Sequence, residues 1–314
     1  PTDPVPFYTI FTGMMLVQLF YWGTNQQIIQ RALGAKDLKE GQKGLLLASF
    51  IKILGPIIVV LPGIIAFHLF QGNLESADSA YPMLVRKVLP TAWVGFFAAV
   101  LFGAILSSFN SVLNSSVTLF GIDVYKQHIN KEADEKTIVK YGKIFGVVLA
   151  IASMFIAPLI ANAGSLFDYL QEINGIYSIP ILTIIVVGYL TKRVPAIAAK
   201  IGLASGCLLY ITSQFFMQPY FVSKALELAK DAGITDEAAL ALIEAQAYPH
   251  FLDVMAILFI MNVVIMLIIG KLYPRKEPFV QEHTKQVDIT PWKYTTQVGI
   301  TICVIVIAIY IYFA

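Results

Sequence analysis

A group of polar and aromatic side chains lies inside the first long uncharged run of the sequence. Gln18, Tyr21, Trp22 and Asn25 follow one another at intervals that place them on one face of a helix, and Gly23 between them allows the helix to unwind. Amide and phenol groups beside an indole ring suit a neutral polyhydroxylated ligand, because sugar hydroxyls bond to amides while sugar C–H faces pack on aromatic rings. Polar packing between membrane helices, with an interfacial aromatic belt, is the alternative interpretation.

A second candidate is Lys52, the only charged residue in the stretch 44–74. At 1.5 Å per residue from a helix start near Glu40, it lies roughly 18 Å inside the helix. A charge at such depth is costly, which makes the residue a functional candidate. It either donates hydrogen bonds to a ligand hydroxyl or to a neighbouring span, or it extends its stem back to the membrane interface.

A third candidate is the hydroxyl-rich stretch AILSSFNSVLNSSVT, in which five polar residues fall on one broad helical face: Ser107, Ser108, Ser111, Asn114 and Ser115. Small hydroxyl residues let membrane helices approach closely, and this packing role is one interpretation. Their oxygens are also hard ligands of the kind that Na⁺ accepts, by analogy with other hard cations. The adjacent pair Ser107 and Ser108 therefore forms a candidate half-site, which needs carbonyl oxygens from another, broken helix.

The fourth candidate is Gln171, a neutral amide near the start of a later uncharged run, which can both donate and accept toward a sugar hydroxyl. The sequence contains no Gly-rich phosphate loop, no nucleophile elbow and no pair of catalytic carboxylates. We therefore expect that the protein is not an enzyme. Coupling to an ion gradient is the expected source of energy.

The elements that position these residues are membrane helices. Of the 314 residues, 57% are hydrophobic and 13% are charged, whereas soluble proteins carry about 25% charged residues. A bilayer core about 30 Å thick needs roughly 20 apolar residues of helix. The uncharged runs predict an all-α transmembrane bundle of eight spans, at 4–30, 44–74, 88–122, 144–167, 168–191, 201–223, 254–270 and 294–314.

The positive charges predict the orientation of these spans. Most of the 22 Lys and Arg residues lie in the segments 31–43, 126–143, 192–200 and 271–285, and positively charged loops remain cytoplasmic. The expected location is the cell membrane, plasma or inner, with the lipid bilayer as a partner. A net charge of +2 and the absence of a basic block with interleaved aromatics exclude a nucleic-acid partner.

The connecting segments give two further expectations. The loop 219–250 is predicted to lie outside the membrane and to carry two amphipathic helices, Ser223–Asp231 and Asp236–Gln246, the second capped by Thr235. Because the chain begins at Pro1, without a methionine or a signal-like segment, we expect it to be partial, with earlier spans of the same protein missing.

Four stretches resemble a known family in the same order along the chain. They are FYWGTNQQIIQRALGAKDLKEGQKG, FIKILGPIIVVLPGI, LSSFNSVLNSS followed by DVYK, and FDYLQEINGI. They resemble the sodium/solute symporter family, and within it the sodium/glucose and bacterial sodium/galactose transporters. The resemblance covers nearly the whole chain.

This resemblance implies the inverted-repeat fold of the leucine transporter. Residues 1–190 would form the five helices of the second repeat, and 191–314 would add three helices. The implied function is Na⁺-driven uptake of a sugar or polyol by alternating access. Symport of another solute, such as sialic acid, an amino acid or a carboxylate, and a non-transporting sugar sensor or channel on the same fold remain alternatives.

The resemblance also implies roles for single residues. Tyr21 matches an aromatic gate beside the sugar, with Trp22 next to it, and the hydrogen-bonding positions are Lys52, Gln171 and Gln18. The bacterial galactose transporter carries Asn where this chain has Gln18, so the identity of the sugar stays open. The sodium site is matched by the carbonyl of Ala104 and the hydroxyls of Ser107 and Ser108. The remaining ligands come, in the family, from the first repeat.

Overall fold

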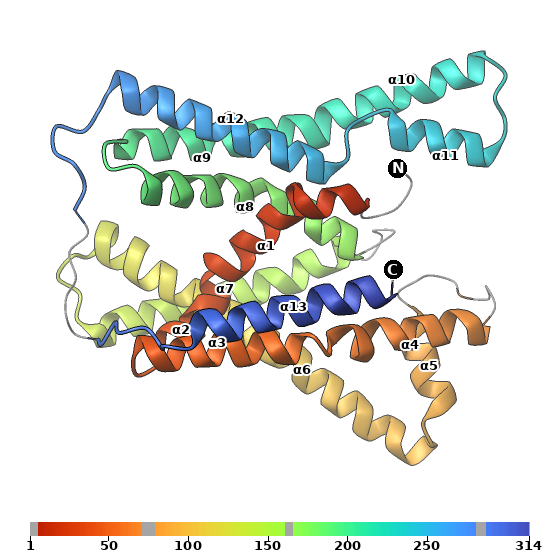
Figure 1. Ribbon diagram of the computed structural model, residues 1–314, viewed down its shortest axis with the longest axis horizontal. Coiled ribbons are helices and arrows are strands. Elements are labelled where there is room, and N and C mark those ends of the chain that lie inside the picture. Colours follow the sequence, from red (N-terminus) through yellow and green to blue (C-terminus); the bar gives the residue numbers. More distant parts are fainter. Residues whose placement is uncertain (1–5, 71–73, 75–78, 161–165, 281–286, 314) are drawn as a thin grey trace. The chain divides into compact units, whose positions relative to one another are not determined.

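The computed structural model describes residues 6–70, 74, 79–160, 166–280 and 287–313. Within these ranges every regular element is a helix, and no strand is present. Parts of the predicted spans and repeats lie outside the described residues, namely those in 1–5, 71–73, 75–78, 161–165, 281–286 and 314. The chain divides into two compact units, one made of 1–28 and 167–283, the other of 29–166 and 284–314 (Figure 1).

The described residues contain seven helical segments that are long and apolar enough to cross a membrane. They are Leu38–Phe70, Thr91–Ile129, Glu135–Pro158, Tyr169–Leu190, Ala196–Asp231, Glu237–Leu272 and Thr295–Tyr312. Seven of the eight expected spans correspond to one of these segments, and the all-α transmembrane bundle is confirmed. The expected span 4–30 has no counterpart among these segments, because its described part is divided into shorter helices.

That first stretch is interrupted twice. A short 3₁₀ turn, Phe7–Phe11, precedes α1 (Gly13–Gly23), and α2 (Gln26–Leu33) follows after a break at Thr24 and Asn25. The backbone N–H groups of Thr24 and Asn25 both donate to the carbonyl of Phe20, at 2.9 and 3.1 Å, so the regular ladder ends there. The expected unwinding is present, one residue beyond Gly23.

The first unit is built on α8 (Leu166–Leu190), α9 (Ala196–Ile211) and α12 (Phe251–Leu272), with α1 packed against α12. Its core includes Val17, Ile179, Tyr210 and Met255, which are all nearly inaccessible to solvent. The Tyr210 hydroxyl donates to the backbone carbonyl of Glu172 at 2.9 Å and so fixes α9 to α8. In Figure 1, α12 lies along α9, as the packing of the two helices requires.

The close contact of α9 with its neighbours depends on small residues. A Cβ added to Gly206 would lie 2.2 Å from Nδ2 of Asn262 and 2.7 Å from Cγ of Pro180. Gly202, one turn earlier, packs on Met266 in the same way. A small residue at every fourth position is the pattern that lets two membrane helices approach closely.

The loop expected over 219–250 is mostly helix. After a π-helical segment, Thr212–Met217, the helix α10 (Gln218–Asp231) continues directly from α9, and α11 (Glu237–Gln246) precedes α12. The prediction of two helices is confirmed. The predicted cap at Thr235 is wrong, because the carboxylate of Asp236 accepts the N–H of Ala239 at 3.2 Å and caps α11.

The second unit contains α3 (Leu38–Lys52), α4 (Gly55–Phe70), α5 (Ala80–Val88), α6 (Thr91–Leu119), α7 (Glu135–Ile160) and α13 (Thr295–Phe313). A π-helical segment, Phe120–Ile129, extends α6 and packs on α7. The rings of Phe120 and Phe145 stack there with centroids 4.0 Å apart. In Figure 1, α13 runs beside α3, with which it makes its contacts.

Candidate functional site

The amide and aromatic group of α1 forms a small hydrogen-bonded cluster. The indole N–H of Trp22 donates to Oε1 of Gln18 at 3.1 Å, one helical turn away. The rings of Tyr21 and Trp22 meet edge to face with centroids 5.4 Å apart. Trp22 and Gln18 are exposed and Tyr21 is half-buried, so the cluster presents an indole face, a phenol and an amide N–H to a ligand.

Asn25 does not extend this stripe, which corrects the expected arrangement of four residues on one face. It lies beyond the end of α1, and its side-chain oxygen accepts the N–H of Gln27 at 3.0 Å. Asn25 is therefore a capping residue of α2, the type of residue that satisfies the free N–H groups of a helix start. A polar residue at position 25 therefore serves the helix break and is not part of the polar face of α1.

Gln171 lies on α8 and is half-buried. It belongs to the same compact unit as the cluster of α1, whereas the remaining four predicted site residues belong to the other unit. The structure thus brings Gln18, Tyr21 and Trp22 together on one helix.

Lys52 is the last residue of α3. The N–H groups of Ile53 and Leu54 bond to the carbonyls of Phe50 and Ile51, which tightens the final turn before α4 begins at Gly55. Lys52 therefore lies at an interruption of the second span rather than within a continuous helix. A cation at a helix C-terminus is favoured by the helix dipole, which offsets part of the cost of placing a charge at this depth.

The sodium candidates Ala104, Ser107 and Ser108 are all exposed on α6. Ser107 lines an open cleft of 710 Å³ in the second unit, formed by α2 and by the polar face of α6. Its other lining residues are Gln30, Arg31, Gly103, Leu106, Asn110, Ser111 and Asn114. Ala104 and Ser108 do not line it, so of the three sodium candidates only Ser107 opens into this cleft.

The two cleft residues that come from α2, Gln30 and Arg31, were not predicted as site residues. Arg31 donates a short hydrogen bond to Oγ of Ser111, and Nε2 of Gln30 donates to the carbonyl of Ser111 at 3.5 Å. The Ser111 hydroxyl in turn donates to the carbonyl of Ser107 at 3.0 Å. In the sequence Arg31 counts among the cytoplasmic loop charges. The signal that could have identified it is its position on a second helix, directly after the break at Asn25.

These features define a multi-pass membrane protein with polar groups inside its spans. The described residues contain seven apolar helical segments, a broken helix with an exposed amide–aromatic cluster, and a second helix with an exposed hydroxyl face. The sequence model of the sodium:solute symporter family matches residues 3–206. The chain belongs to this family of transporters, and it is a multi-pass protein of the cell membrane.

Individual relatives agree with this assignment. The chain is 44% identical over 311 residues to an uncharacterized symporter of Escherichia coli (strain K12), YidK, covering 99% of the chain and 49% of that protein. It is 38% identical to the sodium/glucose cotransporter of Vibrio parahaemolyticus, over 62% of the chain and 38% of that protein. It is 33% identical to the human sodium/myo-inositol cotransporter 2, over 66% of the chain and 33% of that protein. The chain thus spans less than half the length of these relatives.

Proposed function

We propose that this chain carries part of a Na⁺-coupled symporter for a sugar or polyol. The observation that carries the proposal is the helix break directly after the amide–aromatic cluster: α1 ends at Gly23, and Asn25 caps the start of α2. Discontinuous helices are the elements from which secondary transporters build their substrate sites. The cluster supplies an indole face and an amide, the groups that recognise hydroxyls and C–H faces of a sugar.

The coupling ion in this proposal is Na⁺, held by the carbonyl oxygen of Ala104 and the hydroxyls of Ser107 and Ser108. Exposed hydroxyl oxygens on α6 are hard ligands and suit a hard monovalent cation. The names of the two characterised relatives, sodium/glucose and sodium/myo-inositol cotransporter, support both the ion and the class of solute. Lys52 and Gln171 complete the proposed sugar-binding set.

The proposed architecture is an inverted repeat. In it, residues 1–190 are the second repeat, 191–314 are three additional helices, and helices of the first repeat, not contained in this chain, complete both sites. The length of the relatives, about twice that of the chain or more, supports this division. Transport would proceed by alternating access, with one helical bundle rocking against the other.

The test is uptake into proteoliposomes of the full gene product that contains this chain, with and without an inward Na⁺ gradient. The labelled panel is galactose, glucose, myo-inositol and sialic acid. We expect accumulation of one sugar or polyol that disappears without the gradient and is strongly reduced in Ser108→Ala. Unchanged sodium dependence in that variant would remove Ser108 from the ion site. Sugar-evoked current without accumulation would identify a sensor or channel instead.

An acidic solute is the second candidate, and Arg31 favours it. Its guanidinium lines the cleft of the second unit beside three amide side chains, a setting in which it can hold a carboxylate with a bidentate hydrogen bond. Sialic acid carries a carboxylate as well as hydroxyls, whereas the other three solutes of the panel are neutral. Its uptake therefore distinguishes an acidic solute from a neutral sugar. Uptake of sialic acid alone, abolished in Arg31→Gln, would replace the neutral sugar by the acid.

A further inference from the structure

A second cavity of the second unit has no part in the proposed transport. It is a groove of 380 Å³ between α3 and α13, walled by large apolar side chains of both helices with a lysine and a tryptophan at one end. Its lining residues are Lys43, Leu46, Leu47, Phe50, Trp292, Val298, Thr301, Ile302 and Ile305. Both helices are span candidates, so the apolar part of the groove lies at the level of the membrane-spanning segments.

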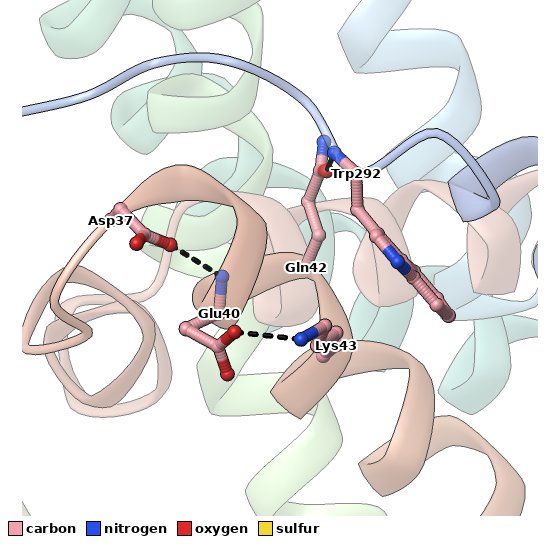
Figure 2. A network of polar contacts seen from close by, with 5 residues as sticks. All are labelled: Asp37, Glu40, Gln42, Lys43 and Trp292. Carbon is pink, nitrogen blue, oxygen red and sulfur yellow. Dashed lines mark hydrogen bonds and ion pairs between the residues drawn. The ribbon is translucent and has the colours of Figure 1, made fainter.

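The end of the groove near Lys43 is held in place by hydrogen bonds. The backbone N–H of Trp292 and the hydroxyl of Thr295 both donate to Oε1 of Gln42, at 2.7 and 2.9 Å. The N–H of Leu38 donates to the carbonyl of Asp288 at 3.0 Å. The segment before α13 is therefore fixed on the first turns of α3, as Figure 2 shows for Gln42 and Trp292.

This mouth carries charges of both signs. Nζ of Lys43 lies 2.7 Å from a carboxylate oxygen of Glu40 and 5.9 Å from the centroid of the Trp292 indole ring (Figure 2). Hydrogen bonds from the Thr290 hydroxyl and backbone hold the pKa of Asp288 below its usual range, so this carboxylate is also charged at neutral pH. Lys43 and Trp292 belong to segments rich in Lys and Arg, 31–43 and 271–293. Lysines and a tryptophan at a helix start are typical of the cytoplasmic membrane interface.

The shape of the groove favours a lipid chain over another helix. A helix is about 10–12 Å across, and membrane helices meet closely where Gly, Ala or Ser lies at the contact. The walls here are mainly Leu, Phe, Val and Ile, with no Gly, Ala or Ser among the lining residues, and the space between them is 380 Å³. Because lipid tails are as apolar as these walls, the tail gains little from entering, and selectivity must come from the headgroup.

We propose that this groove binds a glycerophospholipid of the phosphatidylethanolamine class. One acyl chain lies between α3 and α13, the phosphate accepts hydrogen bonds from Lys43, and the primary ammonium of the headgroup donates to Glu40. The adjacent cation and anion at the mouth match a zwitterionic headgroup with a primary amine. A choline headgroup lacks N–H donors, and an anionic glycerol headgroup would meet the Glu40 carboxylate without a compensating cation of its own.

The test is short-range quenching of Trp292 fluorescence by lipids with brominated acyl chains. In the full gene product, purified in detergent, Trp22, Trp93 and every tryptophan outside this chain are replaced by Phe, so that Trp292 is the one remaining tryptophan, and the protein is titrated in mixed micelles. Brominated phosphatidylethanolamine, phosphatidylcholine and phosphatidylglycerol are compared. We expect phosphatidylethanolamine to quench at an apparent Kd about ten- to hundredfold below that of the other two, the change that one additional charge-assisted hydrogen bond produces.

Four substitutions, one of them a control, identify the groove as the binding site. Val298→Phe fills the groove and should abolish saturable quenching, whereas Ile300→Phe, which is 59% exposed and does not line the groove, should leave it unchanged. Glu40→Gln should remove the preference for the ethanolamine headgroup, and Lys43→Gln should weaken all three lipids. Both of these positions are exposed or half-exposed at the helix surface, so neither change disturbs the interior.

Each other result overturns the proposal. Equal quenching by the three lipids, insensitive to Val298→Phe, means ordinary annular lipid. Preference for phosphatidylglycerol means that only the lysines act. No quenching in the folded protein means that something other than lipid, such as another helix, covers the groove.

Discussion

At the scale of single residues, the side chains of the α1 cluster are not independent binding groups, because they bond to one another. The Gln18 oxygen already accepts from Trp22, whereas its Nε2 has only a weak contact with the sulfur of Met14 at 3.7 Å. Gln18 is thus oriented with its donor end available, and Trp22, which is 40% exposed, is held by its hydrogen bond to Gln18. The sequence predicted these residue types and their face, but which amide end is available follows only from the hydrogen bond.

This orientation predicts the effect of removing the donor. Gln18→Met keeps the length of the side chain and loses its hydrogen bonds, so the KM for the transported sugar should rise about three- to tenfold, the equivalent of one neutral hydrogen bond. Leu19→Met, at the next and 52% exposed position of α1, is the matched control and should leave KM unchanged. Sodium-dependent uptake measured over a range of sugar concentrations checks both, and an equal rise in the two variants would assign the effect to α1 as a whole.

At the scale of elements, the helices follow from apolar run length, while their interruptions follow from local hydrogen bonds. The first predicted span is broken at Thr24 and Asn25, where two N–H groups share the carbonyl of Phe20 and Asn25 starts a new helix. The second span is interrupted after Lys52, where the N–H groups of Ile53 and Leu54 bond three residues back, to the carbonyls of Phe50 and Ile51. Hydropathy averages over twenty residues and cannot detect a defect of two. The spacing of Gly202 and Gly206 on α9 can be read from the sequence. The residues of α12 that they contact, Met266 and Asn262, follow only from the structure.

The close packing of α9 gives a prediction on stability. Gly206→Ala places a methyl group against Asn262 and Pro180, and overpacking of this kind destabilises by about 1–3 kcal/mol. Gly188→Ala on α8 has open space around the new Cβ and should leave stability unchanged or raise it by about 0.5–1 kcal/mol, the helix propensity of Ala over Gly. Thermal unfolding in one detergent compares them. A destabilised Gly188→Ala, or a neutral Gly206→Ala, would contradict the packing described for α9.

The start of α7 gives a prediction on pH. Hydrogen bonds from the hydroxyl and backbone of Thr137 hold the pKa of Asp134 below its usual range, the backbone bond being 3.1 Å long. The unfolded carboxyl has a pKa of about 3.9, so the stabilisation is complete above that pH and is lost as pH falls through the lower folded value. Asp134→Asn should therefore lower the melting temperature at pH 7, and the difference from the wild type should be smaller at pH 3. Thr137→Ala should give a smaller effect of the same sign, and a difference that persists undiminished at pH 3 would exclude the charge as its cause.

At the scale of the whole molecule, the candidate groups divide between the two compact units. Gln18, Tyr21, Trp22 and Gln171 belong to one, and Lys52 with the hydroxyl face of α6 belongs to the other. A symporter needs an energetic coupling between ion and solute, and such coupling must be reciprocal in binding free energy. The sequence could predict the residues of each group. It could not predict the size of their coupling, because that depends on the difference between two global states and not on any local pattern.

The proposed sodium ligands therefore predict a change in coupling rather than in sugar affinity alone. In the full gene product, Na⁺ should tighten sugar binding by a factor typical of coupled sites, about 5- to 150-fold, and sugar should tighten Na⁺ binding by the same factor. The double variant Ser107→Ala, Ser108→Ala should bring both factors close to one, while sugar binding without Na⁺ stays as in the wild type.

Ser116→Ala is the control, because its hydroxyl donates to the Val112 carbonyl of its own helix at 3.0 Å and it does not line the α2–α6 cleft. Calorimetric titration of each ligand in the presence and absence of the other measures both factors. If the double variant weakens sugar binding equally with and without Na⁺, the hydroxyl face of α6 has a packing role, and the ion site lies elsewhere.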